Sequence, residues 1–279
     1  MSEPASRRIW LTELTSAVGL PGAALVDAAG YSRFKHGDAA VARRFAVALA
    51  ALAAQRLPSR PVLVTSSAFG RVPPAAYSLV LPFVHQLRAL RTDLEVGTFG
   101  VRREGISNGD YSRMTLAARR GAITAGDLTP DRDVAGRLVL ALDDIRVTGN
   151  HERAMDRCLL EAGVDEVWHL YVVQAGQFAV SPQIESVLNE SAIDGVQALL
   201  SIASGQRFVP NARLCRRVLA LPDGELRVFV EQAPPALLRW LESAMAQDGL
   251  AAVPAYRERV RVWDEVRGLA HRETQTSAG

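Results

Sequence analysis

The chain has 279 residues, of which 48% are hydrophobic and 22% are charged, as is typical of a folded globular protein. Its formal net charge of +2 is too small for a general nucleic-acid binder, which needs a strongly basic face. The longest apolar run, around residues 45–54, is too short to cross a bilayer, and the N-terminus lacks the pattern of a secretion signal. We therefore expect a cytoplasmic protein that binds neither nucleic acid nor membrane.

The rarer residue types exclude some kinds of site. Cys158 and Cys215 lie among apolar neighbours and form no C-x-x-C pair, which indicates reduced thiols. The five histidines show no metal-ligand spacing, so we expect no zinc site. Lys35 is the only lysine, and it lies in a polar and aromatic cluster over residues 31–38. This cluster is either a loop that leads into a helix or a segment from which Lys35 reaches an anion.

The order of apolar segments predicts alternating strands and helices over the first 180 or so residues. Residues 1–30 contain short apolar segments, which we expect to pack on the main sheet as an extension. Asp38 is a candidate N-cap for the first strong helix. Strands that alternate with helices in this way predict a parallel, doubly wound α/β sheet. The predicted elements are a helix over 38–55, a strand over 60–67, a helix over 75–90, and strands over 93–101, 138–142 and 166–173.

After residue 181 the alternation gives way to amphipathic segments separated by Gly, Pro and Asp. They predict helices over 182–189, 195–202, 212–219, 236–245 and 256–269, with a short strand over 225–230. We therefore expect a mostly helical C-terminal subdomain. The predicted organisation is an N-terminal extension and helix over 1–57, an α/β core over 58–178, the helical subdomain over 179–273 and a disordered tail over 274–279.

The strand over 138–142 ends in two carboxylates, Asp143 and Asp144, and a polar turn containing Gly149 leads into the next helix. In open α/β sheets, ligands bind in the crevice outside the carboxyl ends of the strands. Paired carboxylates there can accept hydrogen bonds from a diol or hold a hydrated Mg²⁺. The exposed N–H groups at the start of a helix can receive a phosphate. This stretch therefore predicts a site for a ligand that carries both hydroxyls and a phosphate.

Two other segments are candidates for binding anions. The turn after the strand over 60–67 has small residues before a helix, which is a weak signal for an anion site. The polar connection over 103–136 is long for a compact domain, and such loops are often functional. Its arginine doublets favour a lid over an anionic ligand, although solvated surface arginines are the other interpretation; the doublets are Arg102, Arg103, Arg119 and Arg120.

Several known motifs are absent, and one family resemblance remains. The chain has neither a Walker A sequence nor a G-x-G-x-x-G fingerprint. Residues 140–149, which read Leu-Ala-Leu-Asp-Asp-Ile-Arg-Val-Thr-Gly, resemble the phosphoribosyl pyrophosphate (PRPP) loop of type I phosphoribosyltransferases. The resemblance covers roughly residues 58–175, with the expected order of elements. It implies a Mg²⁺-dependent enzyme that transfers the phosphoribosyl group from PRPP to a small-molecule acceptor and releases pyrophosphate.

The resemblance also implies roles for individual residues. Asp143 and Asp144 would engage the ribose hydroxyls and Mg²⁺, and Arg102 and Arg103 would neutralise the leaving pyrophosphate together with Lys35. The pyrophosphate turn would contain Ser66, Ser67, Ala68 and Gly70. The 5′-phosphate loop would contain Ile145, Arg146, Val147, Thr148, Gly149, Asn150 and His151.

The chain departs from the family pattern at the end of this loop. Family members commonly have Thr or Ser where this chain has Asn150 and His151. The sequence looks more like a divergent branch encoded in tellurite-resistance-type or secondary-metabolite gene clusters, and this leaves the acceptor undefined. A nucleobase and a sugar hydroxyl both stay open as the acceptor. A homodimer stays open as the oligomeric state. The alternative function is a non-catalytic protein that senses PRPP.

Overall fold

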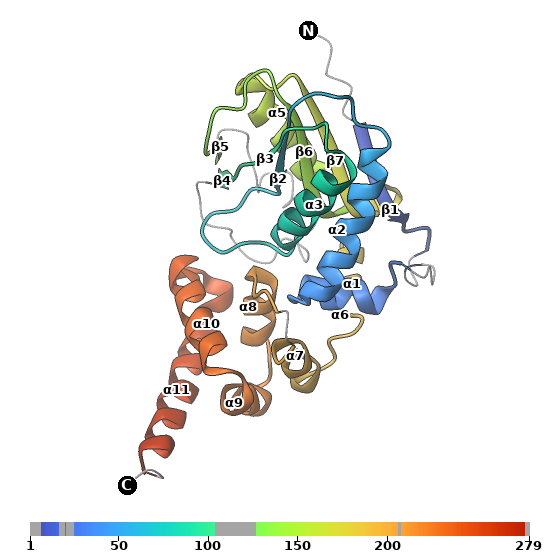
Figure 1. Ribbon diagram of the computed structural model, residues 1–279. Coiled ribbons are helices and arrows are strands. Elements are labelled where there is room, and N and C mark those ends of the chain that lie inside the picture. Colours follow the sequence, from blue (N-terminus) through green and yellow to red (C-terminus); the bar gives the residue numbers. More distant parts are fainter. Residues whose placement is uncertain (1–6, 17–19, 21–24, 104–126, 206–207, 277–279) are drawn as a thin grey trace.

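In the computed structural model, the described residues are 7–16, 20, 25–103, 127–205 and 208–276. Five parallel strands form the central sheet in the order β1-β7-β6-β2-β3 (Figure 1). Their bounds are β1 Arg7–Glu13, β2 Val62–Ser66, β3 Val96–Thr98, β6 Leu138–Arg146 and β7 Glu166–Gln174. A second, two-stranded antiparallel sheet consists of β4 Val101–Arg103 and β5 Leu128–Pro130. The predicted parallel α/β fold is confirmed.

Helices cover both faces of the central sheet, because its strands are buried on both sides. Successive residues of β6 show this division: Leu138 and Leu140 pack with α2 and α3, whereas Val139 packs with α5. The helices of this α/β part are α1 Ala28–Lys35, α2 Ala39–Ala54, α3 Tyr77–Leu90 and α5 Asn150–Glu161. Asp38 caps α2, as predicted, since its side chain accepts hydrogen bonds from the N–H groups of Ala40 and Val41.

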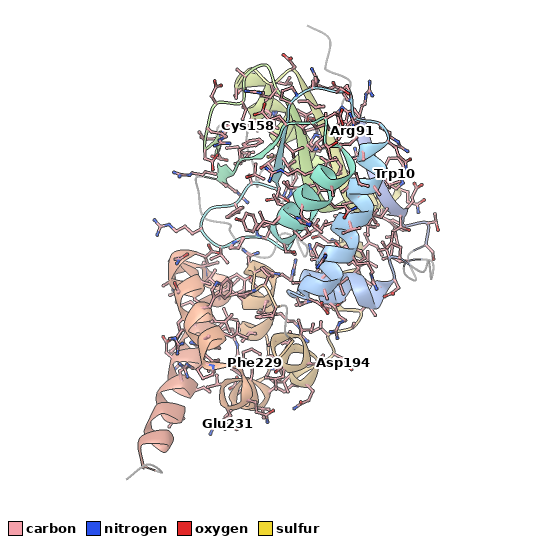
Figure 2. The ribbon with its side chains drawn as sticks, in the orientation of Figure 1. Trp10, Arg91, Cys158, Asp194, Phe229 and Glu231 are labelled. Atoms are coloured by element: carbon pink, nitrogen blue, oxygen red, sulfur yellow. The ribbon has the colours of Figure 1, made fainter. Side chains whose placement is uncertain are left out.

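The C-terminal helices form a separate group that packs around its own apolar core below the sheet in Figure 1. Figure 2 shows Phe229 inside this group, and Cys158 in the α/β part. A short helix, α6 Ile184–Glu190, instead packs against α1. The remaining elements are η3 Gly176–Phe178, α7 Val196–Ala203, α8 Ala212–Leu219, α9 Asp223–Gln232, α10 Pro235–Gln247, η4 Leu250–Ala252 and α11 Pro254–Thr276. Among the described residues, no helix is both long and apolar enough to cross a membrane.

Two predicted strands were wrong in type or extent, and the loop interpretation of residues 31–38 does not hold for residues 31–35. Residues 31–35 belong to helix α1 and not to a loop, because Asp27 caps this helix four residues earlier. The strand predicted over 93–101 is divided between β3 and β4, since the chain leaves the central sheet after Thr98. The strand predicted over 225–230 lies in α9, whose buried residues follow the helical spacing Leu226, Phe229 and Val230.

Two strands extend the central sheet beyond the prediction. Residues 7–13 form β1, which pairs in parallel with β7 from Arg7 to Glu13. Strand β6 continues past Leu142 to Arg146, because its ladder with β7 continues to the pair Arg146–Gln174. The two acids therefore lie inside the strand, near its carboxyl end, and the turn begins after them.

Candidate functional site

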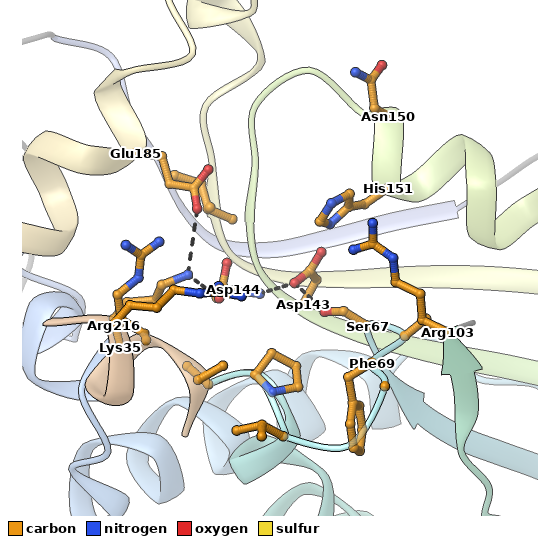
Figure 3. Close-up of a pocket in the computed structure, with 18 of the residues that line it drawn as sticks. Lys35, Ser67, Phe69, Arg103, Asp143, Asp144, Asn150, His151, Glu185 and Arg216 are labelled. Carbon is orange, nitrogen blue, oxygen red and sulfur yellow. Dashed lines mark hydrogen bonds and ion pairs between the residues drawn. The ribbon is translucent and has the colours of Figure 1, made fainter. Parts of the chain in front are cut away.

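A pocket of about 650 Å³ lies between the carboxyl ends of the central strands and the helical subdomain (Figure 3). It brings together residues from both halves of the chain, as ligand sites at the edge of a parallel sheet do. Of the predicted site residues, the pocket is lined by Lys35, Ser67, Ala68, Gly70, Arg102, Arg103, Asp143, Asp144 and residues 145–151. Arg119 and Arg120 lie outside the described residues.

Ser66, which belongs to the predicted pyrophosphate turn, is not among the residues that line the pocket. It is the last residue of β2 and is buried, and its hydroxyl donates to the Ser67 carbonyl at 3.3 Å. Ser67 is the first residue after the strand, and it lines the pocket. The Ser67 hydroxyl donates to Asp143 Oδ1 at 2.7 Å and so connects the turn after β2 to the acid pair.

The surroundings of Asp143 disfavour its negative charge, which a bound cation would stabilise. Burial and the neighbouring charge of Asp144 raise the pKa of Asp143 to about 7, although the hydrogen bonds to its carboxyl oppose this. Both hydrogen bonds that Asp143 accepts from described residues use Oδ1, namely those from Ser67 Oγ and from the Asp144 backbone N–H at 2.9 Å. Strongly perturbed carboxyls in a pocket are typical of functional sites.

Asp144 is neutralised by a side chain from the N-terminal region. Its Oδ2 forms an ion pair with Nζ of Lys35, and Glu185 Oε1 lies 3.8 Å from the same Nζ. All three side chains are nearly buried, with exposed fractions of 7% for Lys35, 10% for Asp144 and 11% for Glu185. Lys35 therefore lies in the pocket, on the last turn of α1, and α6 supplies the second acid.

The turn after β6 leads directly into the N-terminus of α5. Gly149 has a φ of +70°, in the left-handed region that favours glycine, and it directly precedes α5. The first N–H groups of a helix have no partner within the helix, so they are available to an anion. In the turn itself, Arg153 donates to the Thr148 carbonyl at 3.1 Å and to the side-chain oxygen of Asn150. Asn150 and His151 thus form the first residues of α5.

Glu152 holds the base of this turn in place. Its carboxylate accepts hydrogen bonds from Arg8 on β1, from Arg146 Nε on β6 at 2.8 Å and from the Tyr171 hydroxyl on β7 at 2.8 Å. Burial alone would raise the pKa of Glu152, but the hydrogen bonds from the two guanidinium groups lower it to about 2. The Arg146 side chain, which belongs to the predicted ligand-binding loop, is therefore engaged with Glu152 although it also lines the pocket.

The turn after β2 is attached to β4, and this positions the arginine doublet. The N–H of Phe69 donates to the Val101 carbonyl at 3.2 Å, and the N–H of Arg103 donates to the Phe69 carbonyl at 2.9 Å. Figure 3 shows Phe69, Ser67 and Arg103 on one side of the acid pair. The predicted pyrophosphate turn and the predicted arginines are thus adjacent.

The pocket also contains residues that no sequence motif indicates. Arg213 and Arg216 come from α8, and Asp248 follows α10. The two arginines are three residues apart, on the face of α8 opposite to its buried side chains. That spacing was visible in the sequence, but only the tertiary structure shows that this face borders the pocket. Tyr171 and Glu185 were missed for the same reason.

The parallel sheet with paired acids near the carboxyl end of a central strand, together with a family match over most of the chain, places the protein in the type I phosphoribosyltransferase class. The sequence matches the family described as PRTase ComF-like over residues 25–261, which is most of the chain. The protein therefore belongs to the PRTase ComF-like family. Comparison with curated protein sequences gives no match.

Solved structures of phosphoribosyltransferases are distant in sequence. A hypoxanthine phosphoribosyltransferase from Staphylococcus aureus has 11% identity and a TM-score of 0.32, with 48% of this chain and 62% of that chain covered. The present chain thus spans less than two thirds of that protein. A purine phosphoribosyltransferase from Pyrococcus horikoshii has 16% identity and a TM-score of 0.28, with 48% of this chain and 82% of that chain covered.

Proposed function

We propose that the pocket binds PRPP and that the protein transfers the 5-phosphoribosyl group to a small-molecule acceptor. The observation that carries the proposal is the joint position of Asp143, Asp144 and the Gly149 turn in one pocket of a PRTase ComF-like chain. The acids match the two ribose hydroxyls, and the start of α5 matches the 5′-phosphate. The turn after β2, with Arg102 and Arg103, matches the pyrophosphate.

Mg²⁺ fits this site when the ligand supplies part of its coordination. Among the described residues, no group of three or more His, Cys, Asp or Glu side chains could hold a metal ion. Mg²⁺ is commonly bound by one or two carboxylates together with substrate phosphates and water. Asp143 and Asp144 would hold it here, with Asp143 the more available because Lys35 is paired with Asp144. The ion would neutralise charge on the pyrophosphate.

The proposed reaction is a displacement at C1 of the ribose. A bond forms between the acceptor nucleophile and C1, the bond between C1 and the pyrophosphate oxygen breaks, and the acceptor loses a proton. The role of the protein is to position both reactants and to stabilise the negative charge on the leaving group. Guanidinium groups suit the second task because they form paired hydrogen bonds with phosphate oxygens.

A second candidate is a PRPP sensor without catalysis. It is favoured by the phosphate turn, where Asn150 and His151 stand in place of hydroxyl residues and Arg153 already bonds the Asn150 side chain. Release of pyrophosphate separates the two functions. An enzyme releases pyrophosphate from Mg²⁺·PRPP when incubated with a panel of nucleobases, sugars and aromatic acids, whereas a sensor binds PRPP and releases none.

Binding of partial ligands tests the part of the proposal that both functions share. Isothermal titration with PRPP should give saturable binding that weakens when Mg²⁺ is replaced by EDTA. Ribose 5-phosphate should bind more weakly than PRPP, since it lacks the pyrophosphate, and ribose should bind more weakly still. Equal affinity for ribose and ribose 5-phosphate would contradict a phosphate site at the start of α5.

A further inference from the structure

The helical subdomain contributes to the pocket an arginine, Arg216, that forms no close ion pair with another described side chain. Arg216 is half-buried, and it makes no hydrogen bond or ion pair with any described residue. Its Nε is buried and has no hydrogen-bond partner. The Nε of its neighbour Arg217 is likewise buried without a partner, but another guanidinium nitrogen of Arg217 donates to the Ile193 carbonyl at 3.1 Å. Figure 3 shows Arg216 on the Lys35 side of the acid pair, away from Arg103 and His151.

An unpartnered guanidinium that lines a pocket is available to bind an anion. Buried polar groups in folded proteins nearly always have a hydrogen-bond partner. Leaving a charged donor without one is costly, and the cost disappears when a ligand supplies the acceptor. The same wall of the pocket carries a second guanidinium, that of Arg213. Asp248 lines the same pocket, and the positive charge of Arg216 opposes the rise in the pKa of Asp248 that burial causes.

Backbone contacts connect this wall to the turn after β2. The N–H of Ala212, the first residue of α8, donates to the Pro73 carbonyl at 3.0 Å. The Asp248 carboxylate accepts a hydrogen bond from the Val72 backbone, and the Val72 side chain packs in the core of the helical subdomain. The segment that follows the small-residue turn at 67–70 is thus fixed to the helices that carry Arg213 and Arg216.

We propose that Arg216, with Arg213 beside it, binds the pyrophosphate group of PRPP, so that the leaving-group site is shared between the turn after β2 and the helical subdomain. This inference rests on the proposed function. A pyrophosphate carries several charges and many acceptor oxygens, more than one small turn can satisfy. Arginine suits it because its planar guanidinium can bond two oxygens at once. The helical subdomain then has a direct part in binding the donor substrate.

Titration with magnesium pyrophosphate tests the inference without knowledge of the acceptor. Arg216→Gln should weaken binding of both magnesium pyrophosphate and PRPP by about tenfold or more, the loss of one charge-assisted contact to phosphate. Binding of ribose 5-phosphate should not change, because that ligand has no pyrophosphate. Arg216→Lys should fall between the wild type and Arg216→Gln. The matched control is Arg239→Gln, which removes an exposed arginine from α10 and should leave every affinity unchanged.

Two outcomes separate this inference from the proposed function. If the wild type binds PRPP and Arg216→Gln binds magnesium pyrophosphate equally well, the inference is wrong and the proposed function stands. An acid group of the acceptor would then be the anion for Arg216. If the wild type binds neither ligand, the proposed function itself is wrong.

A second variant excludes a folding defect as the cause. Asp248→Asn removes the negative charge next to Arg216 but keeps an oxygen that can accept the hydrogen bond from Val72. It should bind magnesium pyrophosphate more tightly, by about threefold to tenfold, because less repulsion opposes the anion. A damaged fold cannot produce tighter binding. Weaker or unchanged binding in Asp248→Asn, at an unaltered melting temperature, would count against the inference.

Discussion

Lys35, on the last turn of α1, forms an ion pair with the carboxylate of Asp144 in β6, and the two residues are 109 positions apart in the sequence. The pair links the N-terminal region to the acid motif on which the whole site depends. Both side chains are nearly buried, so neither charge is well solvated. The only lysine of the chain thus has a structural explanation: its positive charge offsets the repulsion between two adjacent carboxylates at the edge of a buried sheet.

Removal of the Lys35 charge should therefore destabilise the protein. Lys35→Met keeps the length of the side chain but leaves Asp144 buried without its cation, and we expect a loss of about 3 kcal/mol in the free energy of unfolding. Urea denaturation at pH 7.5 measures it. The double variant Lys35→Met, Asp144→Asn should recover much of the loss, because the unpaired charge is gone. A single variant as stable as the wild type would contradict this role of the ion pair.

The stability contributed by Glu152 should depend on pH. Its pKa is about 2 in the folded protein, against 4.5 as the ordinary value, so its contribution is complete above pH 4.5 and is lost as the pH falls toward 2. The two values correspond to about 3 kcal/mol. Glu152→Gln should thus lower the free energy of unfolding by roughly that amount at pH 7, and the difference from wild type should shrink between pH 4.5 and pH 3.

Chemical denaturation at a series of pH values checks this prediction. Glu161→Gln is the matched control, since Glu161 lies on the same helix but is exposed. Its stability should follow that of the wild type at each pH. A difference for Glu152→Gln that stays constant down to pH 3 would show that the charge of Glu152 is not what stabilises the turn.

Gly149→Ala should impair ligand binding more than folding. At a φ of +70°, a side chain costs about 1–2 kcal/mol, and a Cβ would lie 3.0 Å from a guanidinium nitrogen of Arg146. We expect the turn to shift at the start of α5, where the 5′-phosphate would bind. The affinity for ribose 5-phosphate should fall by about tenfold or more, while the melting temperature falls by only a few degrees. The control is Gly224→Ala, where a Cβ meets no atom within 4 Å.

The parts of the fold that follow from local patterns could be predicted from the sequence. The apolar run over 138–142 and the acids after it correctly indicated a central buried strand with a polar carboxyl end. Asp38 correctly indicated the start of α2. These predictions succeed because strand burial and helix capping depend on neighbouring residues.

The features that could not be predicted depend on contacts between residues that are far apart in the sequence. Residues 7–13 form strand β1 because they pair with β7. Strand β6 extends to Arg146 because its pairing with β7 continues to that residue. The Arg146 side chain is directed to Glu152 by a contact with β1 and β7 that no local pattern reveals. Arg216 borders the pocket only because the helical subdomain is attached to the segment after β2. Such tertiary contacts are not encoded in hydrophobic periodicity.

The central claim is that the acid pair in β6 binds the ribose and Mg²⁺ of PRPP, and one titration tests it most directly. Because the pKa of Asp143 is raised to about 7, Asp143→Asn should cost little stability in the ligand-free protein. Binding of PRPP in the presence of Mg²⁺ should nevertheless fall at least tenfold in Asp143→Asn, and it should stay unchanged in Asp194→Asn, a control on the exposed surface of the helical subdomain (Figure 2). Equal affinity for PRPP in Asp143→Asn and wild type would contradict the account.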